Sequence, residues 1–134
     1  MDSLMPISTK FKDLVSDESK AMLYLGTIMP DGSPQVTPVW FSVDGDFILI
    51  NTNEGRLKDK NMKARTKVAM TIQDPNERYR YIGIRGEVVG YTREGADAHI
   101  EMLSLRYDDK PWNKREGQKR IIFKVKLTHV HDHD

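Results

Sequence analysis

The chain has 134 residues, the length of one ordinary domain, and 21 basic against 20 acidic residues give it a net charge of +1. So even a balance creates no overall field that would draw the molecule to nucleic acids or anionic membranes. Because the sequence has no cysteine, it excludes a disulfide scaffold, thiolate metal sites and a thiol nucleophile.

The start of the chain lacks the features of a leader or a membrane anchor. Residues 1–6 hold neither a basic segment nor a long apolar one, and the longest apolar run, residues 21–29, is too short to span a membrane. We therefore expect one domain over residues 1–134, located in the cytoplasm, with no membrane partner. A core this small would gain from burial against a second chain, so we also expect a homodimer.

The first half of the sequence predicts a strand meander with tight turns. Apolar residues at helical spacing predict a short helix over residues 8–16. Strands are predicted over residues 21–29, 34–42 and 47–52, with Gly32 and Gly45 in the turns between them. Because two prolines in the second of these strands prevent full ladder pairing, it should be an edge strand or carry a bulge.

The second half combines two helices with longer strands. A short basic helix is predicted over residues 56–65, and an amphipathic helix over residues 94–107. Strands are predicted over residues 68–73, 79–92 and 120–128, with bends or bulges at the glycines of the long one. Residues 129–134 should be a frayed tail. The expected fold is mainly β with peripheral α: a small barrel of about six strands, covered by three short helices.

The sharpest candidate site lies where the strand ending at Thr52 meets the basic helix. Residues 56–67 include six basic residues and one acid. The free N–H groups of a helix N-terminus attract anions, and Arg56 and Lys58 add two charges suited to phosphate. A solvated surface helix would show the same charges. A nucleic-acid surface is disfavoured because the rest of the chain is net negative. We favour a site for one phosphate-bearing ligand.

A second candidate site is the segment 36–41. Where proline interrupts a strand, unpaired backbone groups can bind the edge of a planar heterocycle while apolar side chains cover its face. An ordinary sheet core that happens to contain Pro38 and Trp40 is the alternative. Trp112, in a polar loop, either covers a pocket or anchors its loop.

The remaining candidates have weaker signals. Alternating tyrosines around Arg80 could clamp an aromatic or anionic group, although such a pattern usually reflects packing. His99 lies on the polar side of its predicted helix and has the character of a surface histidine. Three histidines alternate at the end of the chain and could bind a metal on one strand face, but a frayed tail is the more frequent explanation. We predict no metal site.

Sequence motifs of several enzyme classes are absent from the chain. It has no nucleophile elbow, no phosphate-binding loop, no metalloprotease helix and no dinucleotide-binding fingerprint. If the protein is an enzyme, a bound cofactor supplies the difficult chemistry, and the protein supplies position and electrostatics.

Together these segments resemble the pyridoxamine 5′-phosphate oxidase-like split β-barrel family. The resemblance begins with residues 26–41, GTIMPDGSPQVTPVWF, and continues through LINT at 49–52 and GRLKDKN at 55–61 to the later strands. Within that family the chain is most similar to the flavin/deazaflavin oxidoreductases that use coenzyme F-420.

This resemblance implies a homodimeric, FMN-binding-like split barrel with cofactor sites at the subunit interface. The strand 35–40 would lie along the tricyclic ring, Asn51 and Thr52 near the ring or its ribityl chain, and Arg56 and Lys58 at the phosphate. A second subunit would contribute its segment 79–81. The residues expected to bind the cofactor are Gln35, Val36, Thr37, Pro38, Val39, Trp40, Asn51, Thr52, Arg56, Lys58, Asn61, Tyr79, Arg80 and Tyr81, with Trp112 on the substrate side.

The function implied is an oxidoreductase that uses F-420 or FMN to transfer a hydride to or from a small conjugated organic substrate. The resemblance leaves F-420 and FMN open. F-420 carries an acidic tail, which the further charges of Lys60, Lys63 and Arg65 would suit, so these charges favour F-420. The alternative is a non-catalytic protein that binds or carries a flavin, a deazaflavin or a tetrapyrrole.

Overall fold

The computed structural model describes residues 6–133. Two predictions fall largely outside the described residues. They are the lack of a leader at residues 1–6 and the fraying of Asp134. Over residues 6–133 no helix combines the length and the apolar character needed to cross a bilayer. The elements are η1 (Thr9–Val15), β1 (Met22–Ile28), β2 (Pro34–Val39), β3 (Phe41–Asp44), β4 (Phe47–Asn53), α1 (Leu57–Ala64), β5 (Lys67–Gln73), β6 (Tyr81–Thr92), α2 (Ala96–Asp108) and β7 (Arg120–His133).

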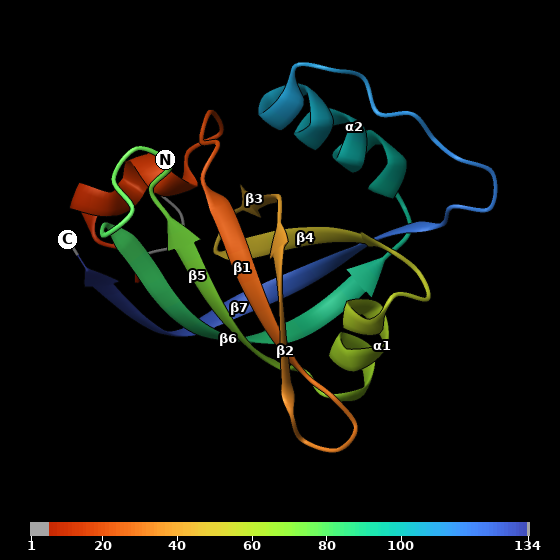
Figure 1. Cartoon of the computed structure of the whole chain (residues 1–134), viewed down its shortest axis with the longest axis horizontal. Coiled ribbons are helices and arrows are strands. Elements are labelled where there is room, and N and C mark those ends of the chain that lie inside the picture. Colours follow the sequence, from red (N-terminus) through yellow and green to blue (C-terminus); the bar gives the residue numbers. More distant parts are fainter. Residues whose placement is uncertain (1–5, 134) are drawn as a thin grey trace.

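The strands form one antiparallel sheet in the order β2-β1-β5-β6-β7-β4-β3. The two edge strands, β2 and β3, are consecutive in the chain and are separated only by Trp40. One residue can join the two edges only if the sheet curls round until they meet, so the sheet closes into a partly open barrel (Figure 1). This confirms the predicted mainly β, barrel-like fold, and it confirms β2 as a proline-bearing edge strand.

The apolar interior of this barrel is continuous with η1. Phe11 and Leu14 of η1 are buried in the same cluster as Phe41, Ile50 and Phe123 of the strands. The helix α2 packs elsewhere: its buried Ile100 and Leu103 lie outside that cluster and face the β2–β3 seam and the loop that follows α2. In Figure 1, α1 and α2 lie on the opposite side of the sheet from η1 and the labelled termini.

The structure corrects several predicted elements. The described residues form seven strands, since the predicted strand 34–42 divides at Trp40, where the chain passes from one edge of the sheet to the other. The predicted helix at 8–16 is a 3₁₀-helix. The bulges predicted for the long strand occur beside Gly86 and Gly90. A Cβ at Gly86 would lie 2.7 Å from the Lys126 carbonyl oxygen, which explains the glycine there.

The predicted tail is also wrong, because β7 continues to His133 and stays paired with β6. The His133 ring stacks on Tyr81 with centroids 4.8 Å apart, and its Nδ1 lies 2.8 Å from the carbonyl oxygen of Tyr79. The His131 ring lies over Gly83, where a Cβ would come within 2.3 Å of it. Because β6 is twelve residues long, it still pairs with β7 at His131 and His133. The composition of residues 129–134 did not predict this pairing.

Candidate functional site

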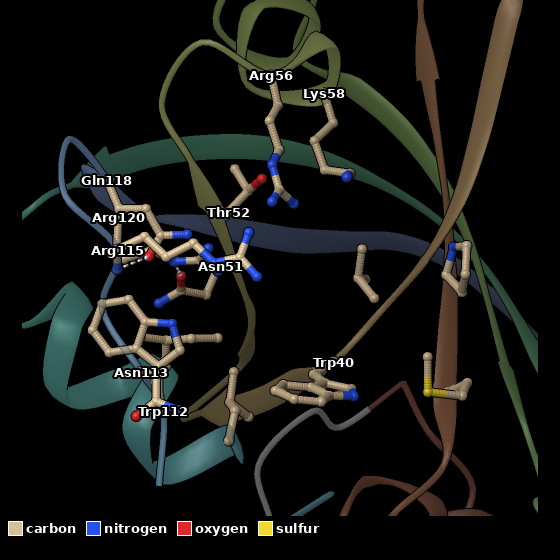
Figure 2. Close-up of a pocket in the computed structure, with 15 residues that line it drawn as sticks. Trp40, Asn51, Thr52, Arg56, Lys58, Trp112, Asn113, Arg115, Gln118 and Arg120 are labelled. Carbon is tan, nitrogen blue, oxygen red and sulfur yellow. Dashed lines mark hydrogen bonds between the residues drawn. The ribbon is translucent and has the colours of Figure 1, made fainter. Parts of the chain in front are cut away.

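A cavity of about 430 Å³ opens beside the β2–β3 seam, bordered by the start of α1, the buried face of α2 and the loop 109–119 (Figure 2). Its size is within the range of small-molecule sites. Pro38, Val39 and Trp40 of the seam line it, so the second predicted segment does contribute to a pocket. The other residues around it are Met22, Asn51, Thr52, Arg56, Lys58, Ile100, Leu103, Trp112, Asn113, Arg115, Gln118 and Arg120.

The side chains around this cavity are strongly cationic. Arg56 and Lys58 come from the start of α1, Arg115 from the loop and Arg120 from the first position of β7, and no acidic residue is among the fifteen that line the cavity. Burial, and then the charges of Arg56 and Arg120, lower the pKa of Lys58. Burial and Arg56 also lower the pKa of Arg120 to about 10. These cations destabilise one another, and a bound anion would relieve that repulsion.

The start of α1 is built to present its first turn to the cavity. Gly55 has φ +97°, a conformation that glycine adopts without strain, and its N–H donates to Asp59 Oδ2 at 2.8 Å. Arg56 is the N-cap and makes no capping hydrogen bond through its side chain. The positive end of the helix and the two cationic side chains of its first residues therefore lie together. This confirms the predicted strand-to-helix junction, and it places Arg56 and Lys58 at one cavity.

Thr52 carries an unsatisfied polar atom at this cavity. The residue is 1% exposed, and its Oγ1 has no hydrogen-bond partner within the protein. Figure 2 shows the Thr52 side chain beside that of Arg56, on the side of the cavity where the α1 cations lie. A buried hydroxyl without a partner costs free energy, which a ligand oxygen in the cavity would recover. The donor set and this hydroxyl fit the phosphate and polyol chain of a flavin-type cofactor.

Asn51 lines the cavity, but the protein itself uses its amide. Its Oδ1 accepts a hydrogen bond from Arg120 Nε at 2.8 Å. Its Nδ2 donates to the Ala96 carbonyl at 2.9 Å and to His99 Nδ1 at 3.0 Å. Asn51 thereby connects β4 to the first turn of α2 and to Arg120. Sequence reasoning missed Arg120, because nothing local distinguishes it from the other basic residues near the start of the last strand.

His99 is not the surface histidine that the helical pattern suggested. Its ring bonds to Asn51 on one side and to Ser42 Oγ on the other, at 2.8 Å from Nε2. Burial, and then the charges of Arg106 and Arg120, lower its pKa to about 4. At neutral pH His99 is therefore an uncharged connection between α2 and strands β3 and β4.

Two tryptophans lie at the cavity. Trp40 stacks on Tyr107 of α2 with centroids 5.2 Å apart and planes 9° apart, and the Tyr107 hydroxyl donates to the Ala21 carbonyl at 2.7 Å. Trp112 lies in the loop, with its backbone N–H on Glu101 Oε1 at 3.3 Å and its ring 5.9 Å from the Arg120 guanidinium. Trp112 thus lines the cavity, and its loop is tied to α2; its expected place on the substrate side stays a prediction.

Several predicted site residues lie away from this cavity within the chain. Gln35, Val36 and Thr37 are not among its lining residues, and Val36 faces a hollow on the outer side of the sheet. Asn61 is buried on the far side of α1, where its Nδ2 donates to Thr27 Oγ1 at 3.0 Å. It attaches α1 to β1, so the structure gives Asn61 a packing role in place of the expected phosphate contact.

The segment 79–81 lies by η1 and is likewise outside the cavity. The Arg80 guanidinium pairs with Asp13 and Asp74, each at 2.7 Å, and lies over the Phe11 ring. Arg80 therefore holds η1 against the sheet. The expected contribution of Tyr79, Arg80 and Tyr81 to the site of a second copy stays a prediction.

The charge argument for F-420 is not supported by the positions of the further cations. Lys63 pairs with Glu54 and Asp59 at 3.2 and 3.0 Å, and Arg65 donates to the Ile28 carbonyl at 2.7 Å. Neither of these residues nor Lys60 lines the cavity.

Over residues 6–133, no cluster of three or more histidine, aspartate or glutamate side chains is placed to hold a metal ion.

Comparisons with known proteins identify the family. A family model described as pyridoxamine 5′-phosphate oxidase matches residues 7–134, and the chain belongs to this family. An F420 reductase of known structure is 31% identical, with a TM-score of 0.80 over 93% of this chain and 98% of that one.

Two further solved structures show likeness of fold. A conserved hypothetical protein from Mycobacterium tuberculosis is 21% identical, with a TM-score of 0.69 over 96% of this chain and 85% of that one. HupZ of Group A Streptococcus is 16% identical, with a TM-score of 0.67 over 94% and 93%. Comparison with curated proteins finds no match.

Proposed function

We propose that this protein is an oxidoreductase that binds F-420 or FMN in the cavity beside the β2–β3 seam and uses it to transfer a hydride to or from a small conjugated organic molecule. The observation that carries the proposal is the set of four cationic side chains, without an acid, around a cavity that also contains the unpartnered hydroxyl of Thr52. The likeness to an F420 reductase supports F-420 as the first cofactor to test.

The cavity has a charged end, which would bind the phosphate of the cofactor, and an apolar end, which would bind its ring. Arg56 and Lys58 hold the phosphate, together with the N–H groups at the start of α1, and Thr52 donates to an oxygen next to it. At the other end Pro38 and Val39 lie along the ring. Because Pro38 has no N–H and lies on an edge strand, the backbone around it is not fully used by the sheet.

The chemistry of the reaction belongs to the cofactor, which when bound and reduced would supply a hydride. The protein fixes the position of the reacting groups and excludes water around them. Trp40, held against Tyr107, provides a rigid flat wall. Trp112 covers the substrate side, where its loop is tied to α2. No side-chain nucleophile is required.

The proposal includes a homodimer. The outer face of the sheet carries hollows of about 410 and 460 Å³, lined by residues of β1, β2, β5, β6 and β7. Val36, on this face, is 64% exposed. A second copy that covers this face would bury apolar surface that water otherwise contacts. A monomer mass in sedimentation would contradict this part of the proposal.

Titration of the purified protein with F-420, FMN and riboflavin tests the function. Riboflavin lacks the phosphate of FMN, so the difference between their affinities measures the anion site alone. We expect F-420 or FMN to bind tightly and riboflavin to bind much more weakly. Reduced cofactor is then mixed with conjugated enones and with tetrapyrroles of the biliverdin type, and its oxidation is followed by absorbance.

Each outcome of these titrations has a defined meaning. Oxidation of the bound cofactor by an acceptor supports the oxidoreductase. Tight binding without oxidation by any acceptor contradicts it and favours a carrier protein. Binding of neither coenzyme would refute the site itself, and so would a tightly bound FMN whose affinity riboflavin equals.

A further inference from the structure

The cavity cation Arg120 is held by a chain of hydrogen bonds that begins outside the cavity. Arg120 is 8% exposed and its Nε donates to Asn51 Oδ1 at 2.8 Å. Behind Asn51 the chain continues to His99 at 3.0 Å and from there to Ser42 at 2.8 Å. Of these residues, Asn51 and Arg120 line the cavity, whereas His99 and Ser42 do not.

The partners of Asn51 fix every donor and acceptor in this chain. Arg120 Nε is always a donor, so it must face the amide oxygen of Asn51. The Ala96 carbonyl is always an acceptor, so it must face the amide nitrogen. That nitrogen also points at His99 Nδ1, which must therefore accept. The proton of neutral His99 then lies on Nε2 and is donated to Ser42 Oγ.

The half-buried position of His99, between α2 and the sheet, keeps it in this uncharged form. The charged groups that act on the ring are both cations, Arg106 of α2 and Arg120 of β7, and together with burial they disfavour a charged imidazole. A second proton would place an N–H of His99 against the N–H of Asn51. That repulsion would favour rotation of the Asn51 amide and would remove the acceptor of Arg120.

We propose that His99 is a positioning residue for the ligand site: it fixes the orientation of the Asn51 amide, which in turn holds the Arg120 guanidinium at the cavity. In its effect on affinity this proposal rests on the function proposed above. Arg120 is one of the four cations around the cavity, and it lies across from Arg56 and Lys58 (Figure 2). A buried cation that is oriented before the ligand arrives binds it without a further loss of side-chain freedom.

A double-mutant cycle on cofactor affinity tests whether His99 acts through Arg120. The variants are His99→Leu, Arg120→Met and the two combined, titrated with FMN and with F-420 at neutral pH. We expect His99→Leu to weaken binding about five- to tenfold, up to about 1.4 kcal/mol, and Arg120→Met to weaken it at least as much. Once Arg120 is gone, His99→Leu should have no further effect. Losses that multiply in the double variant would overturn the proposal.

A second measurement needs no ligand and separates this proposal from the proposed function. Nuclear magnetic resonance should show His99 protonated at Nε2 and the Nε–H of Arg120 protected from exchange with water. His99→Leu should remove that protection, and His99→Gln, which keeps an acceptor for Asn51, should restore part of it. An unchanged Arg120 signal in His99→Leu would refute the positioning role even if neither coenzyme binds.

Arg106→Met is the matched control. Arg106 also attaches α2 to the sheet, through a 3.0 Å bond from Nη1 to the Phe41 carbonyl, and it does not line the cavity. A general loosening of α2 would affect both variants alike. We expect Arg106→Met to leave the Arg120 signal and the affinities unchanged. A loss in Arg106→Met equal to that in His99→Leu would show a structural effect and would contradict the proposal.

Discussion

Removal of the two cations at the start of α1 should abolish the preference for a phosphorylated cofactor. A hydrogen bond to a charged group contributes about 1.5–3 kcal/mol. Arg56 is exposed and screened by water, so it belongs at the lower end, whereas half-buried Lys58 belongs at the upper end. Together they contribute about 3–4.5 kcal/mol, so Arg56→Ala with Lys58→Ala should weaken FMN binding by a factor of about 10²–10³.

The same double variant should stay folded and keep its oligomeric state. The pKa of Lys58 is lowered by burial and by the charges of Arg56 and Arg120, so neutral residues relieve repulsion in the empty site. Riboflavin affinity should not change, since riboflavin has no phosphate. Lys20→Ala with Lys60→Ala removes the same charge from exposed positions and serves as control. An unchanged FMN affinity, or equal losses for FMN and riboflavin, would refute the assignment of this junction as the anion site.

Three further predictions follow from single contacts. Thr52→Val, which removes the unpartnered hydroxyl, should leave the melting temperature unchanged or raise it while weakening cofactor binding about fivefold; equal affinity would exclude a ligand contact there. Gly86→Ala should destabilise the fold by about 1–3 kcal/mol in urea unfolding, because its Cβ would meet the Lys126 carbonyl oxygen. Gly83→Ala should cost less, because the three atoms nearest to its Cβ belong to the movable ring of His131. The reverse order would contradict this. The pKa of His99 is lower in the folded protein than in the unfolded chain, which therefore binds the extra proton first, so stability should fall as pH drops from about 6.5 to about 4. His99→Gln should flatten that dependence, and a wild-type stability that stays constant over this range would contradict it.

Local pattern determined much of this protein. The positions of six of the seven strands, the basic helix after Gly55 and the edge character of the proline-bearing strand all follow from periodicity, turn residues and the missing proline N–H. Arg56 and Lys58 could be selected as a candidate anion site because the helix terminus and the two charges are neighbours in the chain, and the structure places both at one cavity. These predictions depended only on interactions between residues that are close in the chain, and such interactions can be inferred from the sequence.

Tertiary structure decided what depends on distant partners. The curl of the sheet made Trp40 a junction between two edges, and the length of β6 turned the histidine tail into a paired strand. Among the six basic residues of segment 56–67, packing left two at the cavity and engaged Lys63 and Arg65 elsewhere. Arg120 became part of the site only because its strand pairs with β4 beside Asn51. The sequence determines the charge of each side chain, but the tertiary structure determines which group that side chain contacts.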